Sequence, residues 1–385
     1  MKRFKKFILV EEARFPVNKG HAYEFVLAAA MVARFTDRYD DGTPEPLTPK
    51  AVYQVMSHYF KRNVIWTVEE GDSQIDTVEF DGAGLPPGVL AALSVDAIRK
   101  SSTVKAMVGK AISAVKDNTT LTDLSTEVIQ NHKADEVVVK CGGTTGQMTT
   151  KSDVDLYVND NVVRKAGFSV KYGGVGQVAQ WAGVDLAKNI SDGFDSFGMT
   201  LSGAMVKPIK SAFQDPNFIG VYKTRQDPQV EKDKDIIFSA VRGVFTKIGN
   251  KFKDSWFDKP ENVETLTTGL LKAAKGKEED IELVKNGFTY NKANFDALAR
   301  GISNSAKDSK TNIRWMVIAE DGNPKVQLWI DDIKIFQIRC RYDADPNKTK
   351  SFYKVRFRLY VELDKGAIEV IKKVRELESM TKSKR

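Results

Sequence analysis

The chain has 385 residues, 42% of them hydrophobic and 29% charged, a composition typical of globular proteins and not of disordered ones. No apolar run approaches the roughly 20 residues that a membrane-spanning helix needs, and two cysteines exclude a disulfide framework. A net charge of +8, from 59 basic and 51 acidic residues, favours an anionic partner, nucleic acid first. We therefore expect a protein of a reducing compartment, the cytoplasm, with no membrane partner.

The first part of the chain is expected to be mostly helical. Residues 20–36 form the clearest helix, because Ala, Leu, Met and Val dominate them. Residues 63–70 have the composition of a strand. Further helices are predicted at 88–100, 103–117 and 121–132.

The pattern changes after residue 133. The β-branched run 134–141 predicts a strand, and two more strands are predicted at 152–159 and 166–172, on either side of a polar turn. Residues 175–190 carry apolar side chains at helical spacing and predict a helix. Three strands followed by a helix make a compact α/β unit.

The remaining chain divides into a helical and a strand-rich part. We expect residues 191–310 to be a mostly helical insertion, and residues 311–385 to supply strands and a last helix that complete the sheet begun at 135–172. Residues 1–190 then hold the N-terminal helices and the α/β core.

Two acids and a lysine stand in the strands around the polar turn. Asp153 and Asp155 are two apart and are therefore expected on one face of their strand, as are Ser169 and Lys171 on the next. Mg²⁺ needs only one or two carboxylates, together with waters and phosphate oxygens. A neighbouring lysine can position the attacking water and offset the charge that develops on a phosphate.

These residues resemble a motif of the restriction-endonuclease-like, or PD-(D/E)XK, nuclease superfamily. The motif stands as S-D-V-D-L, then F-S-V-K, with Asp153 opening one strand and Lys171 ending the next. The resemblance implies the core order αβββαβ, a mixed central sheet flanked by helices, and Mg²⁺ or Mn²⁺ as the cofactor. It also implies that Asp153 binds the metal, that Lys171 is catalytic, and that the carbonyl of Val170 is an additional ligand.

An acid of the first core helix often joins this site in the superfamily. Glu24, in the predicted helix 20–36, is the candidate. His21, three residues earlier, is expected to be a surface or capping residue and not a ligand.

The sequence departs from the family pattern at its second acid. Ser169 stands where that acid is expected, and Glu24 or Asp155 could compensate for it. In the helix predicted after the lysine, Gln177 and Gln180 share a face, which resembles the glutamine-bearing helix of several branches. Gln177 is therefore a further candidate for the site.

Basic and apolar residues alternate near the C-terminus. One face of these strands is expected to be apolar, and the other presents five cations that suit backbone phosphates: Arg339, Arg341, Lys354, Arg356 and Arg358. The alternative is a solvated outer face of an antiparallel sheet.

Three possibilities remain open from the sequence. The first is a metal-dependent endonuclease that hydrolyses phosphodiester bonds of DNA, which we expect to be double-stranded. Such enzymes are commonly homodimers when they cut both strands. The alternative is a non-catalytic nucleic-acid-binding or assembly protein, viral for instance, that keeps a degenerate nuclease fold. The third is an unrelated structural protein of helices and sheets, in which 152–172 is an exposed hairpin with a cross-strand ion pair.

Overall fold

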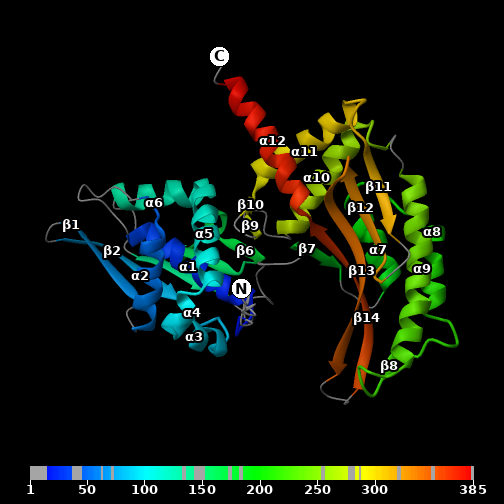
Figure 1. Cartoon of the computed structure of the whole chain (residues 1–385), viewed down its shortest axis with the longest axis horizontal. Coiled ribbons are helices and arrows are strands. Elements are labelled where there is room, and N and C mark those ends of the chain that lie inside the picture. Colours follow the sequence, from blue (N-terminus) through cyan, green and yellow to red (C-terminus); the bar gives the residue numbers. More distant parts are fainter. Residues whose placement is uncertain are drawn as a thin grey trace, which may run out of the picture. The chain divides into compact units, whose positions relative to one another are not determined.

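The computed structural model (Figure 1) describes residues 15–36, 46–61, 64–70, 73–131, 136–142, 152–171, 176–181, 185–252, 256–275, 282–285, 288–318, 322–347 and 352–382. Within these ranges no helix is both long and apolar enough to cross a bilayer. The protein is of the mixed α/β type and divides into two compact units. Unit 1 comprises residues 1–173 and 280–288, and unit 2 comprises 174–279 and 289–385.

Unit 1 is built around an eight-stranded mixed sheet. Its helices are α1 (Lys19–Thr36), α2 (Pro49–Phe60), α3 (Pro87–Ser94), α4 (Asp96–Arg99), α5 (Ser102–Asp117) and α6 (Thr119–Asn131). The strands of its sheet are β1 (Ile65–Glu70), β2 (Ser73–Asp81), β3 (Glu136–Cys141), β4 (Val154–Val158), β5 (Asn161–Val162), β6 (Phe168–Lys171), β9 (Glu282–Lys285) and β10 (Phe288–Tyr290), and of β10 only Phe288 falls within unit 1. Their order is β1-β2-β3-β4-β6-β9-β10, and β5 pairs with β4.

The middle of this sheet is an antiparallel run that ends on a parallel strand. β4 is antiparallel to both β3 and β6, whereas β9 runs parallel to β6. Parallel neighbours need a crossover connection. The chain leaves unit 1 at residue 174 and returns at residue 280, so the connection from β6 to β9 runs through unit 2.

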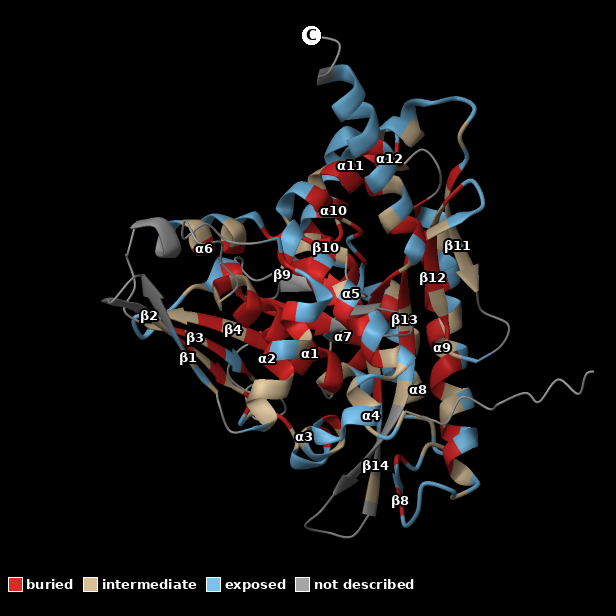
Figure 2. Ribbon diagram, turned by 60° about the vertical axis from the view of Figure 1, so that its left-hand side comes forward, coloured by how far each residue is buried: buried red, intermediate tan, exposed pale blue. Residues whose placement is uncertain are grey.

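Helix α1 lies in the core of unit 1. Every residue from Ala22 to Ala33 is buried, as Figure 2 shows in red. The helix packs against β2, β3 and β6 and also against α2 and α5. A helix that is apolar on nearly all sides is stable only when it is enclosed in this way. The helix predicted over 20–36 is confirmed.

The polar turn after β4 has the geometry of a tight hairpin. Asn159 (φ 47°) and Asp160 (φ 63°) both occupy the left-handed region, which Asn and Asp tolerate better than other non-glycine residues. Val158 pairs with Asn161 across the turn. The strands predicted at 134–141, 152–159 and 166–172 are confirmed as β3, β4 and β6 within the described residues, and residues 134, 135 and 172 lie outside them.

Unit 2 contains a second, six-stranded sheet. Its strands are β7 (Gly176–Trp181), β8 (Val221–Tyr222), β11 (Ile313–Ile318), β12 (Lys325–Ile330), β13 (Ile333–Asn347) and β14 (Phe352–Leu363). The helices are α7 (Leu186–Asp195), α8 (Gly203–Ala212), α9 (Gln229–Lys251), α10 (Pro260–Lys275), α11 (Lys292–Lys307) and α12 (Lys365–Lys382). The order is β11-β12-β13-β14-β7, and β8 also pairs with β14.

The last strands do not complete the first sheet, and that prediction is wrong. β13 and β14 are long and pair with each other along the whole of β14, and β7 then pairs with β14. Apolar side chains of one sheet face, among them Phe336 and Leu359, pack on helices α7 and α9. The predicted helical insertion at 191–310 is therefore not a separate part, because its helices cover this sheet.

The helix predicted over 175–190 is also wrong in its first half. Residues 176–181 form β7, and the helix α7 begins only at Leu186, with Asp185 as its N-cap (Lys188 N to Asp185 Oδ1, 2.9 Å). A short apolar run fits either period, and pairing with β14 decides it here. The tertiary partner overrides the local pattern.

Candidate active site

Asp153 lies in a bend immediately before β4 and joins this strand to β6. Its backbone N–H donates to the carbonyl of Phe168 (2.8 Å), and its own carbonyl accepts from Gly142 N (2.9 Å). The carboxylate Oδ2 accepts from the backbone N–H of Val170 (2.6 Å) and from the hydroxyl of Ser169 (3.3 Å). Only Val154 and Phe168 pair directly between β4 and β6, so the carboxylate continues the ladder where backbone pairing stops.

Burial makes this carboxylate costly unless it is compensated. Asp153 is 4% exposed and Ser169 1% exposed. A buried charge is tolerated when hydrogen bonds or a cation satisfy it. The Val170 N–H and the Ser169 hydroxyl are two such hydrogen-bond donors to Asp153. The hydroxyl of Ser169 therefore stabilises the Asp153 carboxylate and does not supply a second negative charge.

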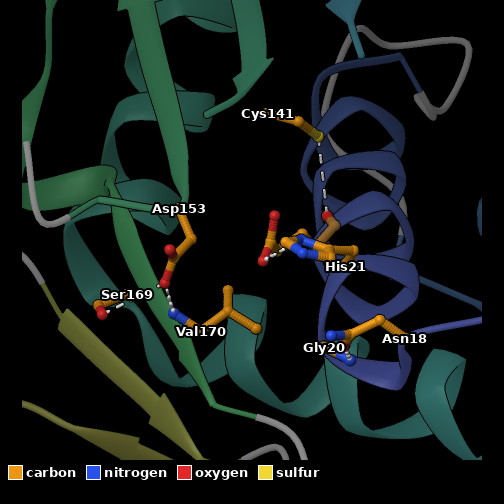
Figure 3. A network of polar contacts seen from close by, with 8 residues as sticks. Asn18, Gly20, His21, Cys141, Asp153, Ser169 and Val170 are labelled. Atoms are coloured by element: carbon orange, nitrogen blue, oxygen red, sulfur yellow. Dashed lines mark hydrogen bonds and ion pairs between the residues drawn. The ribbon is translucent and has the colours of Figure 1, made fainter. Parts of the chain in front are cut away.

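Glu24 is a second buried carboxylate of unit 1. It projects from α1, is 4% exposed, and lies with its Oε1 3.2 Å from Nδ1 of His21. In Figure 3 the His21 ring points from α1 toward the side of the strands on which Asp153 lies. That Glu24 shares a site with Asp153 stays a prediction.

His21 is the residue that the sequence interpretation missed. Its side chain is only 15% exposed and contacts Glu24, so it is neither a surface nor a capping residue. The i,i+3 spacing to a glutamate within a helix of buried residues was the available signal.

Cys141, at the end of β3, ties α1 to the sheet. Its thiol donates to the backbone carbonyl of Glu24 (3.9 Å). Burial raises the pKa of the Cys141 thiol well above its ordinary value, and the negative charges of Glu24 and Asp81 raise it further. The thiol is therefore neutral, and it brings no additional negative charge next to Glu24.

Lys171 directly follows Val170, whose backbone N–H donates to the Asp153 carboxylate. It ends β6, where its backbone position is paired with Lys285 of β9. The structure thus brings the backbone of Lys171 next to Val170, as the predicted strand pair requires. Its side chain lies outside the described residues.

Two other predicted site residues lie elsewhere. Asp155 is half-buried and stands opposite Lys140 of β3, whereas the neighbouring Val154 stands opposite Cys141, which contacts α1. Alternation along the strand therefore turns Asp155 away from α1. Asp153 lies in the bend before β4, where this alternation does not apply, so the expected shared face of the two acids stays a prediction. Gln177 belongs to β7 of unit 2, opposite Glu362, so the predicted glutamine-bearing helix does not form; Gln180, on the same strand, is exposed.

A buried polar row crosses the second sheet. The side-chain amide of Gln327 donates to Gln337 (2.9 Å), and that of Gln337 donates to Glu362 (2.5 Å). Arg339 forms an ion pair with the other oxygen of Glu362. The guanidinium of Arg339 is therefore engaged inside the sheet, and it is removed from the predicted row of phosphate contacts.

The other predicted basic contacts lie on β13 and β14. Arg341 and Arg356 are exposed and Arg358 is half-buried, while the alternate residues Cys340 and Phe357 are buried. The predicted alternation of a basic and an apolar face is confirmed for these positions. The side chain of Lys354 lies outside the described residues.

The oxygen donors of this region are of the type that Mg²⁺ prefers. In the described part of the chain no three His, Cys, Asp or Glu side chains form a group that could hold a metal ion. Mg²⁺, however, commonly uses one or two carboxylates and keeps several waters. Glu24 and Asp153 are two buried carboxylates of unit 1, and their convergence on one ion with the carbonyl of Val170 stays a prediction.

Comparison with protein-family models, with curated proteins and with solved structures gives no match to this chain.

Proposed function

We propose that the protein is a metal-dependent nuclease with a restriction-endonuclease-like core in unit 1, and that it hydrolyses phosphodiester bonds of double-stranded DNA. The single observation that carries the proposal is the pair of buried carboxylates, Glu24 and Asp153, with Lys171 one residue beyond the Asp153–Val170 hydrogen bond. Charged side chains kept in a protein interior are more often functional than surface ones.

The order of elements supports this core. The resemblance implies αβββαβ, and unit 1 has α1, then β3, β4 and β6, then a crossover to β9, which is parallel to β6. The crossover that a single helix makes in the simplest form of this fold is here the much longer connection through unit 2.

Each residue has a role in the proposed reaction. Glu24 and Asp153 would hold the cation, with the carbonyl of Val170 as an additional oxygen ligand. When bound, the ion would supply an activated water and neutralise charge on the phosphate. Lys171 orients the attacking water and stabilises the extra negative charge as the water oxygen bonds to phosphorus and the bond to the leaving ester oxygen breaks.

A non-catalytic protein with the same core is the second candidate. It is favoured by the bonds of Asp153 to Val170 and Ser169, because these give the carboxylate a structural task that needs no metal. On this account the fold serves nucleic-acid binding or assembly, and Ser169 marks a lost acid.

The test is cleavage of supercoiled plasmid and of a short duplex, with Mg²⁺, with Mn²⁺ and with EDTA. The nuclease proposal expects metal-dependent nicking or cutting, and a loss of about 100-fold or more in Lys171→Ala. Lys165→Ala, an exposed lysine of the same unit, is the matched control and should cleave normally. Cleavage that survives Lys171→Ala unchanged, or no cleavage with either metal, refutes the proposal and favours the second candidate.

A further inference from the structure

A pocket of about 390 Å³ lies in unit 2, between the helices α11 and α12 and the turn that joins β12 to β13. The two helices pack side by side (Figure 1) and approach closely at Gly301, where an added Cβ atom would lie 2.3 Å from Val370. The ion pair of Arg300 with Glu378 (2.8 Å) also joins them. A pocket of this volume is within the range of small-molecule sites.

Apolar side chains form a large part of the pocket wall. Ile330 and Val374 are 5% and 9% exposed, whereas Ile333 and Leu377 are 38% and 56% exposed. A ligand that covers the two exposed side chains removes apolar surface from water. None of the described residues that line the pocket is aromatic, so a flat or quaternary cation finds no ring to stack on there. The wall therefore suits an aliphatic ligand.

Negative charge predominates in this pocket. Three carboxylates and one ammonium group line it, those of Asp308, Asp331, Glu369 and Lys373. Asn304 and Ser305, near the C-terminal end of α11, line it as well. The C-terminal end of a helix carries a partial negative charge. The pocket thus favours a cation, although the protein as a whole has a net charge of +8.

Hydrogen bonds hold two of the carboxylates in place. Asp308 follows the last residue of α11 and accepts from the N–H of Lys310 (3.0 Å) and from the hydroxyl of Thr311 (3.0 Å). These two bonds lower the pKa of Asp308. Asp331 has a left-handed backbone (φ 52°) and accepts from the N–H of Asn312 (2.8 Å). Carboxylates that are held in this way lose less entropy when a ligand binds.

The three carboxylates come from different elements. Asp308 follows α11, Asp331 lies in the turn between β12 and β13, and Glu369 belongs to α12. In the part of the chain that the structure describes, they do not form a group that could hold one metal ion. A ligand that neutralises them therefore needs positive charges that are separated from one another by apolar segments.

We propose that this pocket binds a small aliphatic polyamine. Its ammonium groups, each with three hydrogen-bond donors, contact the carboxylates of Asp331 and Glu369. Its methylene segments cover Ile333 and Leu377. Every lining residue belongs to unit 2, so the site does not depend on the nuclease function that is proposed for unit 1.

Isothermal titration calorimetry of the full chain, freed of nucleic acid and kept at low ionic strength, tests the proposal with spermidine as the probe. The wild type should bind spermidine saturably. Glu369→Gln and Asp331→Asn should each weaken binding about fivefold, as expected for the loss of one exposed ion pair. Because the two carboxylates contact different ammonium groups, the double variant should bind about 25-fold more weakly. Asn tolerates the left-handed backbone of residue 331 and keeps an acceptor, so the fold is retained.

Two controls separate this site from unspecific attraction of cations. Glu376→Gln changes an exposed glutamate of α12 that does not line the pocket, and it should leave binding unchanged. Hexaamminecobalt(III) carries the same charge as spermidine but has no methylene segments. It should bind at least about tenfold more weakly, which corresponds to roughly two buried methylene groups.

Four outcomes overturn the inference: no saturable binding of spermidine, unchanged affinity in the double variant, an equal loss in Glu376→Gln, or equal binding of the two cations. None of these measurements depends on DNA cleavage. A protein that never cuts DNA thus loses the proposed nuclease function and keeps the polyamine site, and the reverse result is equally distinct.

Discussion

Replacing Asp153 separates its structural task from its proposed metal-binding one. Asp153→Ala removes the acceptor of the Val170 N–H and of the Ser169 hydroxyl at a site that is 4% exposed. Asp153→Asn keeps a carbonyl oxygen that can accept from Val170 but removes the negative charge that a cation requires. The two variants are therefore expected to behave alike in catalysis and differently in stability.

The expected losses in the free energy of unfolding follow from the two hydrogen bonds that Asp153 accepts. A hydrogen bond to a charged group contributes about 1.5–3 kcal/mol, and the 2.6 Å bond from Val170 belongs to that class. The 3.3 Å bond from Ser169 is longer, and we assign it about 0.5–1 kcal/mol. Asp153→Ala should thus lower the free energy of unfolding by about 2–4 kcal/mol, and Asp153→Asn by about 1 kcal/mol.

Urea denaturation followed by circular dichroism gives the free energies, and hydrogen exchange read by mass spectrometry locates the change. Peptides that contain β6 (Phe168–Lys171) should exchange faster in Asp153→Ala and nearly normally in Asp153→Asn. Equal stabilities of the two variants, with β6 protected in both, would show that the carboxylate does not hold β4 to β6. For cleavage assays Asp153→Asn is the informative variant, because a loss in Asp153→Ala can arise from altered packing.

Three further outcomes are expected. Glu362→Ala leaves the half-buried guanidinium of Arg339 without its charge partner, and it should lower the free energy of unfolding, measured in urea, by about 3–5 kcal/mol. Arg339→Met combined with Glu362→Leu should lower this free energy by less than Glu362→Ala alone does. The reverse order would contradict the ion-pair account. The Cys141 thiol, whose pKa burial raises, should react with a disulfide reagent at about pH 8 only after unfolding. Rapid labelling of the native protein would refute this expectation. Because the folded pKa of the thiol is raised, its contribution to stability is complete below the ordinary thiol pKa of about 8.5 and falls as pH rises above it. Cys141→Ala should therefore reduce the pH dependence of the free energy of unfolding between about pH 8.5 and 10.

The local elements of unit 1 could be predicted because their patterns are unambiguous. The apolar run of α1 has no strand-like alternation, and the β-branched run of β3 is bounded by polar segments. The turn at Asn159 and Asp160 fixes the pairing of β4 with β5. The approach of Asp153 to β6 depends on the separate pairing of Val154 with Phe168.

What could not be predicted depends on partners distant in sequence. β7 satisfies both a helical and a strand pattern, and only its pairing with β14 decides between them. The short strand β9 has too few residues to predict that it joins β6. The ion pair between Arg339 and Glu362 depends on the register of β13 against β14. Alternation along one strand does not predict this register, because the whole sheet sets it.

Metal binding by Glu24 and Asp153 tests the central claim most directly. Titration of the protein with Mn²⁺, with free ion followed by electron paramagnetic resonance, measures it without a nucleic-acid substrate. Loss of an outer-sphere partner already costs about 10–100-fold in metal affinity, so loss of a direct ligand in Glu24→Gln or Asp153→Asn should cost at least about tenfold. Glu127→Gln, an exposed glutamate of unit 1, is the control and should bind normally. Saturable Mn²⁺ binding that both site variants lose is the predicted result, and a wild type that binds no ion, or variants that bind it equally well, would contradict the account.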